Sequence, residues 1–167
     1  GLLPESPLPL VALAEMHGAL MDAQAAEQAL RKALAIAPDS MDVRQRMMAL
    51  ALQRKDQQGA LRLAREAQSR KPDLPAGYLL EGDVHAVSGQ WPDAAEAYRK
   101  ALERKGGGSA AVRLHSALCR ADRKADASRM AQGWLKDNPT DLVLRAHLGE
   151  LALSEGRHAD AVGIFTR

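Results

Sequence analysis

Two side chains with basic and nucleophilic chemistry lie four residues apart in the sequence. His115 and Cys119 would share one face of a helix, which can place a base beside a thiol. A thiol catalyst also needs a group that orients the histidine and donors that stabilise an oxyanion. No Asp or Asn that could orient the histidine lies within one helical turn of His115, and no such loop is visible nearby. We therefore interpret His115 and Cys119 as packing residues.

Three other short patterns could bind a metal ion or a phosphate. His147 with Glu150, and Glu155 with His158, have spacings that a metal could use, but no HExxH motif or Cys/His cluster accompanies them. The glycine run 106–108 follows no strand and precedes no Lys-Ser/Thr pair, so it is not a phosphate-binding loop. The sequence predicts that the chain is not an enzyme and that it has no metal site and no cofactor.

Composition favours closely packed helices. Of the 167 residues, 46% are apolar but only 3% are aromatic, and the residues that favour strands are scarce. The charges nearly balance, with 23 basic and 21 acidic residues, so nothing attracts the chain to nucleic acid. No apolar run approaches the roughly 18 residues of a membrane span. Cys119 is the single cysteine, so no internal disulfide forms.

The sequence repeats itself with a period of 34, 34, 33 and 34 residues. The repeating units begin at Pro7, Met41, Pro75, Gly108 and Leu142. The twentieth residue of every unit is alanine: Ala26, Ala60, Ala94, Ala127 and Ala161. Three units carry proline at their thirty-second place: Pro38, Pro72 and Pro139. A period near 34 is typical of units that each contain two helices.

The small residues indicate how the two helices of a unit pack. Gly82 and Gly149 cost about 1 kcal/mol each inside a helix relative to alanine, so we expect a neighbouring backbone to approach them closely. Large residues such as Leu13, Tyr98 and Phe165 should fill the remaining space between the helices. Proline should end each second helix, because it is not tolerated in a helix interior.

The units resemble the tetratricopeptide repeat (TPR) family. The stretches "YLLEGDVHAVSGQWPDAAEAY" and "LGELALSEGRHADAVGIF" keep its glycine, alanine and aromatic spacing, with departures at Glu81 and His85. The resemblance implies an all-α, right-handed superhelical solenoid of antiparallel helix pairs, and a non-catalytic scaffold for protein–protein interaction. The expected organisation is a tail or linker over 1–6 and a TPR array over 7–167. The expected units are 7–40, 41–74, 75–107, 108–141 and 142–167.

Two features of the array lead to further expectations. The fifth unit stops at its twenty-sixth residue with no polar capping helix, so we expect the chain to be a fragment of a longer array. The run 106–108 replaces the proline between the third and fourth units. It is either a relaxed turn or a hinge.

A narrower resemblance comes from three longer stretches. "SPLPLVALAEMHGALMDAQAAEQALRKALAIAPDS", "PAGYLLEGDVHAVSGQWPDAAEAYRKAL" and "LHSALCRADRKADASRMAQGWLKDNP" are similar to the TPR lipoprotein of the exosortase/PEP-CTERM system. The resemblance implies a role in bacterial exopolysaccharide production and protein sorting at the cell envelope. It implies a periplasmic or outer-membrane-associated location and leaves a cytoplasmic one open. Cys119 lies too deep in the chain to be the lipid-bearing cysteine.

The TPR resemblance also implies a concave groove, lined by the first helices, that binds a protein or an extended peptide. The groove residues would be Val11, Glu15, Gln45, Ala49, Leu52, Leu79, Asp83, Val112, Ser116, Ala146 and Glu150. This partly apolar surface suits an extended segment with hydrophobic anchors. The places that grip chaperone C-terminal carboxylates in one TPR subgroup hold Val11, Glu15, Arg46, Ala76 and Leu80. Only Arg46 suits such a grip, so we do not expect chaperone tails to bind.

An alternative function uses no groove in this stretch. The chain would then be a structural spacer, with the ligand groove elsewhere in the array, or a self-associating segment. In the second case its open terminal repeat would meet a copy of itself.

Overall fold

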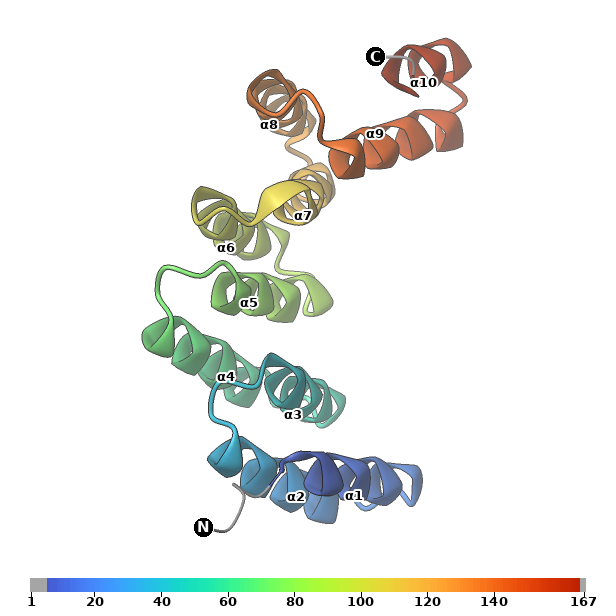
Figure 1. The fold of residues 1–167 in the computed structure, drawn as a ribbon. Coiled ribbons are helices and arrows are strands. Elements are labelled where there is room, and N and C mark those ends of the chain that lie inside the picture. Colours follow the sequence, from blue (N-terminus) through green and yellow to red (C-terminus); the bar gives the residue numbers. More distant parts are fainter. Residues whose placement is uncertain (1–5, 166–167) are drawn as a thin grey trace. The chain divides into compact units, whose positions relative to one another are not determined.

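The computed structural model describes residues 6–165, which form ten α-helices and no strand. Residues 1–5 of the expected tail and residues 166–167 of the expected fifth unit lie outside this part. The helices are α1 (Leu8–Ala19), α2 (Ala23–Ile36), α3 (Met41–Gln53), α4 (Gln57–Arg70), α5 (Ala76–Val87), α6 (Trp91–Glu103), α7 (Gly107–Arg120), α8 (Lys124–Asp137), α9 (Leu142–Ser154) and α10 (His158–Phe165). Consecutive helices form antiparallel pairs, from α1/α2 to α9/α10 (Figure 1). The predicted all-α fold of paired helices is confirmed.

The turn inside each helix pair has the same backbone geometry every time. One residue of each turn has a positive φ: Met21 (59°), Lys55 (61°), Gly89 (72°), Asp122 (58°) and Gly156 (74°). In every case the next N–H bonds to a carbonyl five residues earlier, as in Asp22 to His17 and Gln90 to His85. This is the C-terminal motif in which a left-handed residue closes the last helical turn. The backbone therefore repeats with the period of the sequence.

Side-chain caps fix where several helices begin. The carboxylates of Asp22 and Asp56 accept the backbone N–H groups of Ala25 (3.0 Å) and Gly59 (2.8 Å). Asp141 does the same for the first turn of α9 and also accepts from the indole Nε1 of Trp134 at 2.6 Å. These bonds satisfy donors that a helix start leaves without a partner.

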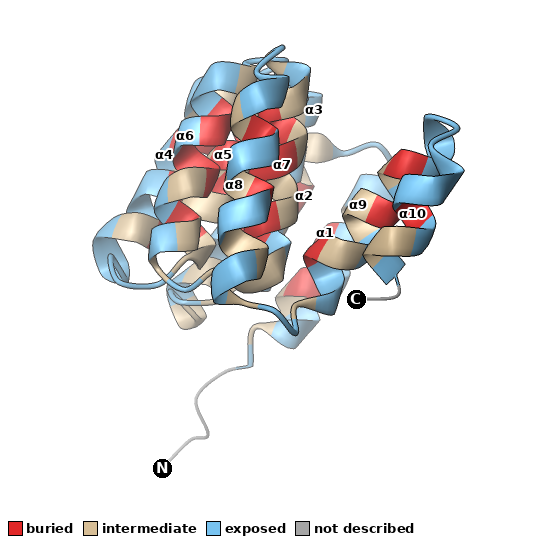
Figure 2. Cartoon of the chain, turned by 90° about the horizontal axis from the view of Figure 1, so that it is seen from above, coloured by how far each residue is buried: buried red, intermediate tan, exposed pale blue. Residues whose placement is uncertain are grey.

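The chain divides into two compact units, residues 1–72 and residues 73–167. In the first unit, a core of alanines with Val11, Leu30 and Val43 lies among α1, α2 and α3. In the second unit, Tyr98, Leu114 and Leu118 centre the core of α5–α8. Leu144 joins α9 to this second core beside Ala111 and Ala131. Figure 2 marks these buried stretches in red.

The alanine column lies in the core. Ala26, Ala60, Ala94, Ala127 and Ala161 are all between 0% and 3% exposed. A larger side chain at these places would push the paired helices apart, because a filled core has no room for extra methyl groups. The repeating alanine column is therefore part of the core.

Aromatic rings, rather than a neighbouring backbone, approach the two helical glycines. A Cβ added at Gly82 would meet the Tyr98 ring at 2.3 Å, and one at Gly149 would meet the Phe165 ring at 2.2 Å. The expectation of close backbones was therefore wrong. Tyr98 fills the inter-helix space at 4% exposure, whereas Phe165 is 55% exposed and Leu13, expected to be a filler, is 39% exposed.

The segments between the pairs differ in how they are built. Pro38, Pro72 and Pro139 each follow the end of a second helix by two residues, as predicted. The glycine run has a packing role instead. A Cβ at Gly106 would lie 2.7 Å from the Ala101 carbonyl oxygen, and one at Gly108 would lie 2.4 Å from the Asp141 carboxylate. The boundary between the two compact units lies elsewhere, after Pro72.

Candidate functional site

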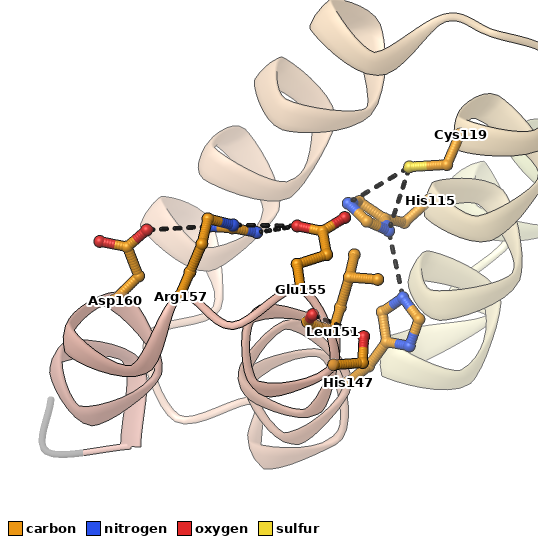
Figure 3. Close-up of polar contacts among 8 residues, drawn as sticks. His115, Cys119, His147, Leu151, Glu155, Arg157 and Asp160 are labelled. Carbon is orange, nitrogen blue, oxygen red and sulfur yellow. Dashed lines mark hydrogen bonds and ion pairs between the residues drawn. The ribbon is translucent and has the colours of Figure 1, made fainter.

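The residues with potential for chemistry form one cluster in the second unit, between α7 and α9. His115 Nδ1 lies 3.1 Å from His147 Nε2, and the two rings meet edge to face with centroids 5.1 Å apart. The Cys119 sulfur is 3.9 Å from His115 Nδ1, a weak contact. Figure 3 shows the two histidines facing each other, with the thiol above them. His115 is buried, at 5% exposure.

The electrostatics of this cluster do not favour a nucleophile. Burial raises the pKa of the Cys119 thiol, so the neutral thiol predominates at neutral pH. Burial, and then the neighbouring His147, lower the pKa of His115. Glu155, whose negative charge acts on His115, pairs with Arg157 at 2.7 Å (Figure 3). The cluster lacks a histidine-orienting carboxylate and an activated thiol, so we interpret it as structural.

No group of three metal-ligating side chains is present in the described part of the chain. His147 is partly buried against His115, whereas Glu150, Glu155 and His158 are exposed. No described helix is both long and apolar enough to cross a membrane.

The groove residues predicted in the first unit come from α1 and α3. Gln45 and Ala49 are exposed and Leu52 is partly exposed. Val11 is in the core at 7% exposure, so it offers almost no surface to a ligand. Glu15 is exposed and accepts a hydrogen bond from Arg46 at 2.5 Å.

The single cation at a carboxylate-gripping place is held by internal acids. Besides Glu15, Arg46 also binds Asp42, at 2.9 Å. The hydrogen bond to Asp42 has the largest effect and raises the pKa of the Arg46 guanidinium. Burial lowers this pKa, and the bond to Glu15 raises it further. Neutralised in this way, Arg46 is poorly placed to attract the carboxylate of a ligand.

The groove residues predicted in the second unit come from α5, α7 and α9. Leu79, Val112 and Ser116 are partly buried, and Ala146 and Glu150 are exposed. Helices α7 and α9 pack against each other, so their predicted residues lie on neighbouring helices. We call Val112, Ser116, Ala146 and Glu150 the α7–α9 surface.

Asp83 takes part in a polar network that the sequence did not reveal. It accepts a hydrogen bond from the Tyr98 hydroxyl at 2.8 Å and forms an ion pair with Arg113. Burial, and then the bond to Asp83, raise the pKa of Tyr98 well above its usual value. The network joins α5, α6 and α7, so Asp83 has a packing role at the predicted groove.

A hollow in the first unit was also missed. It measures about 640 Å³ and lies among α2, α3 and α4. Leu34, Met47, Leu50 and Leu63 contribute apolar side chains, and arginines and acids stand among its lining. Several of these charges pair with one another, for example Arg54 with Glu27 at 2.6 Å. No sequence motif signals such a hollow, because it arises from incomplete packing among three helices.

Comparisons with known proteins bear on the fold. No family model matches the sequence, and no curated protein matches it. Among solved structures, MamA from Desulfovibrio magneticus RS-1 is 22% identical over 81% of this chain and 78% of its own, with a TM-score of 0.58. TTC0263, a thermophilic TPR protein of Thermus thermophilus, is 17% identical over 96% and 89%, with a TM-score of 0.62. YrrB, a TPR protein with an unusual peptide-binding site, is 20% identical over 84% and 73%, with a TM-score of 0.55. At these identities the likeness concerns the fold, and the chain has the all-α TPR solenoid fold.

Proposed function

We propose that the chain is a non-catalytic scaffold that binds an extended peptide segment of a protein partner along its first helices. The α7–α9 surface carries this proposal. It combines partly exposed Val112 and Ser116 with exposed Ala146 and Glu150 on two adjoining helices. A surface with small, apolar and single acidic groups suits a segment with hydrophobic anchors and few charges. That a TPR protein of similar fold has a peptide-binding site supports the proposal.

The test adds a charge and bulk at exposed groove positions. Ala49→Glu in the first unit and Ala146→Glu in the second alter exposed side chains, so the helices should remain folded. Ala125→Glu makes the same change at an exposed place on the second helix α8 and is the matched control. The probe is one peptide selected by display against the protein at pH 7.5, and its affinity is measured by fluorescence anisotropy.

We expect at least one groove variant to weaken binding about tenfold or more, which corresponds to roughly 1.4 kcal/mol. The Ala125→Glu control should bind as the parent protein does. Equal affinity of all three variants and the parent, with unchanged helical circular dichroism, would show that the first helices do not form the binding surface.

The finer proposal places this scaffold in an exopolysaccharide and PEP-CTERM protein-sorting system, in the periplasm or at the outer membrane. It is supported by the three long stretches that are similar to the TPR lipoprotein of that system. The test is deletion of the gene in its host, followed by measurement of surface polysaccharide and cell fractionation of the tagged protein. Unchanged polysaccharide together with a cytoplasmic location would end this proposal.

Self-association is the second candidate, and the exposure of equivalent repeat positions favours it. Leu114 and Ala117 on α7 are each 1% exposed, in the same core cluster as Ala95 of α6. In the repeat register, Leu13 and Met16 of α1 stand at the places of Leu114 and Ala117, yet they are 39% and 52% exposed.

The matching place on α10 is exposed as well. Val162 of α10 stands at the place of Ala95 and is 62% exposed, against 1% for Ala95. Two copies could therefore meet head to tail, with α10 of one packing on α1 of the other as α6 packs on α7. Such a heterologous contact would produce chains of copies rather than a closed dimer.

A further inference from the structure

The contact between α7 and α9 contains a pair of histidines whose geometry depends on their protons. His115 Nδ1 and His147 Nε2 are 3.1 Å apart, which is a hydrogen-bond distance. A neutral imidazole has one N–H donor and one acceptor nitrogen, so the bond needs a donor on one ring and a lone pair on the other. When both rings carry two protons, two N–H groups point at each other and both rings are positive. The contact then becomes repulsive.

The surroundings do little to compensate two positive charges. His115 is 5% exposed, so a charge there would lose most of its hydration. From α9 and its end, Glu150 acts on His147 and Glu155 acts on His115, but Glu155 is already bound to Arg157. From α7 the neutral Cys119 thiol faces His115, and Lys124 at the start of α8 adds a positive charge near that thiol. The neighbouring α6 contributes alanines and Tyr98 to the adjoining core.

The attachment of the last helix pair depends on this contact. Helix α9 packs mainly on α7 and on its own partner α10, and only slightly on α8. Its apolar anchor is Leu144, which is fully buried beside Ala111 and Ala131. A repulsive histidine pair therefore acts on the main contact that holds α9 and α10 to the preceding pair. Because the contacts of a repeat array are local, such a pair can open while the rest stays folded.

We propose that the His115–His147 contact is an acid-sensitive switch, which keeps the α9–α10 pair docked on α7 at neutral pH and lets it detach when both rings are protonated. The regulatory consequence rests on the proposed function. The α7–α9 surface would lose its continuity at acidic pH, and a peptide bound across it would be released.

The direction of the pH dependence follows from linkage. Burial lowers the pKa of both histidines below the ordinary value of 6.5 in the docked state. The open state therefore binds more protons once the pH falls below 6.5, and docking is weakened there. Well above 6.5 the rings are neutral in both states, and docking no longer depends on their protonation. Each histidine can change the opening equilibrium by up to about tenfold per pH unit below 6.5, and the two together by up to about a hundredfold.

Hydrogen exchange of the whole protein between pH 7.5 and 5 tests the switch. After correction for the intrinsic exchange rate, amides of α9 and α10 should lose protection as the pH falls below 6.5, by up to about a hundredfold per pH unit, while those of α5 and α6 change much less. In the variant His115→Gln with His147→Gln the pH dependence in α9 and α10 should be largely lost. His158→Gln, an exposed histidine at the start of α10, is the matched control and should keep it.

Imidazole titration by NMR on the unaltered protein gives an independent reading, so the idea stays testable if the double variant does not fold. Midpoints of His115 and His147 below 6.5 support the switch. Midpoints at or above 6.5, or equal pH dependence of exchange in the parent and double variant, would overturn it. The display-selected peptide is measured separately. If it binds at pH 7.5 and stays bound at pH 5 while α9 and α10 open, the regulatory role fails and the proposed peptide binding stands.

Discussion

Replacing Gly82 by alanine tests whether the ring of Tyr98 is fixed in the core. The added Cβ would lie 2.3 Å from Cε1 and 2.5 Å from Cδ1 of that ring. Tyr98 is 4% exposed and its hydroxyl is bound to Asp83 at 2.8 Å, so the ring cannot move aside without losing packing and a hydrogen bond. Overpacking costs about 3 kcal/mol at the upper end, and alanine recovers about 1 kcal/mol of helix propensity. We therefore expect Gly82→Ala to lower the opening free energy of the α5/α6 pair by about 2 kcal/mol.

Substitutions at two other glycines distinguish the cost of the steric clash from the gain in helix propensity. Gly149 stands at the same repeat place, and its Cβ would lie 2.2 Å from the Phe165 ring, but that ring is 55% exposed and has room to move. Gly149→Ala should therefore leave the opening free energy of its helix pair unchanged or raise it by up to about 1 kcal/mol. Gly133, within α8, has no atom within 4 Å of an added Cβ. Gly133→Ala should show the propensity gain alone.

Local opening free energies from native-state hydrogen exchange are the suitable measurement, because a repeat array need not unfold in one step. Amides of α5 and α6 report on Gly82→Ala, those of α9 and α10 on Gly149→Ala, and those of α8 on Gly133→Ala. If Gly82→Ala stabilised its helix pair, or changed it as little as Gly149→Ala does, the argument that a locked ring sets the identity of this residue would be wrong.

Three further predictions address association and stability. Leu13→Glu with Met16→Glu should abolish concentration-dependent association in sedimentation velocity, and a parent protein that stays monomeric at high concentration would remove the self-association candidate. Lys55 has a φ of 61°, a left-handed conformation that glycine adopts at lower cost. Lys55→Gly should therefore stabilise the fold by about 1 kcal/mol and raise the thermal midpoint. A lower midpoint would contradict this account of the turn. Arg44→Ala should cost about 3 kcal/mol in urea unfolding, since Arg44 is 3% exposed and donates to a backbone carbonyl at 2.8 Å. The exposed Arg62→Ala is its control and should cost less than about 0.5 kcal/mol.

The repeat and its helix pairs could be read from the sequence because small residues recur in step. The alanine at every twentieth place is buried in each unit, and a packed core leaves little room for a larger side chain there. The turns could not be read in the same way. Met21, Lys55 and Asp122 adopt the left-handed conformation that glycine adopts in the other two turns, although these residue types do not predict it. Here the helix contacts on both sides overcome a local preference.

Contacts between helices of different pairs could not be predicted from the sequence. Asp83 pairs with Arg113 thirty residues away, and His115 meets His147 thirty-two residues away. Helical periodicity shows which face a residue is on, but it does not show which side chain the next pair brings opposite to it. These contacts depend on the angle between pairs, which many packed residues determine together.

The exposure of the predicted groove side chains differs along the first helices, so only some of them are available to contact a ligand. The predicted groove residues fall on two places of the repeat, the fifth and the ninth, apart from Leu52. At the fifth place, the apolar side chains of Val11, Leu79 and Val112 are drawn wholly or partly into the core, so they offer less surface than their chemistry suggests. The ninth place stays at the surface, but the acids of two repeats are neutralised there by arginines, as in Asp83 with Arg113. Of the ninth-place acids, Glu150 alone has no ion pair among the described residues. In the proposed complex, a basic group of the peptide would therefore be attracted to α9, and its apolar groups would contact the rest of the surface.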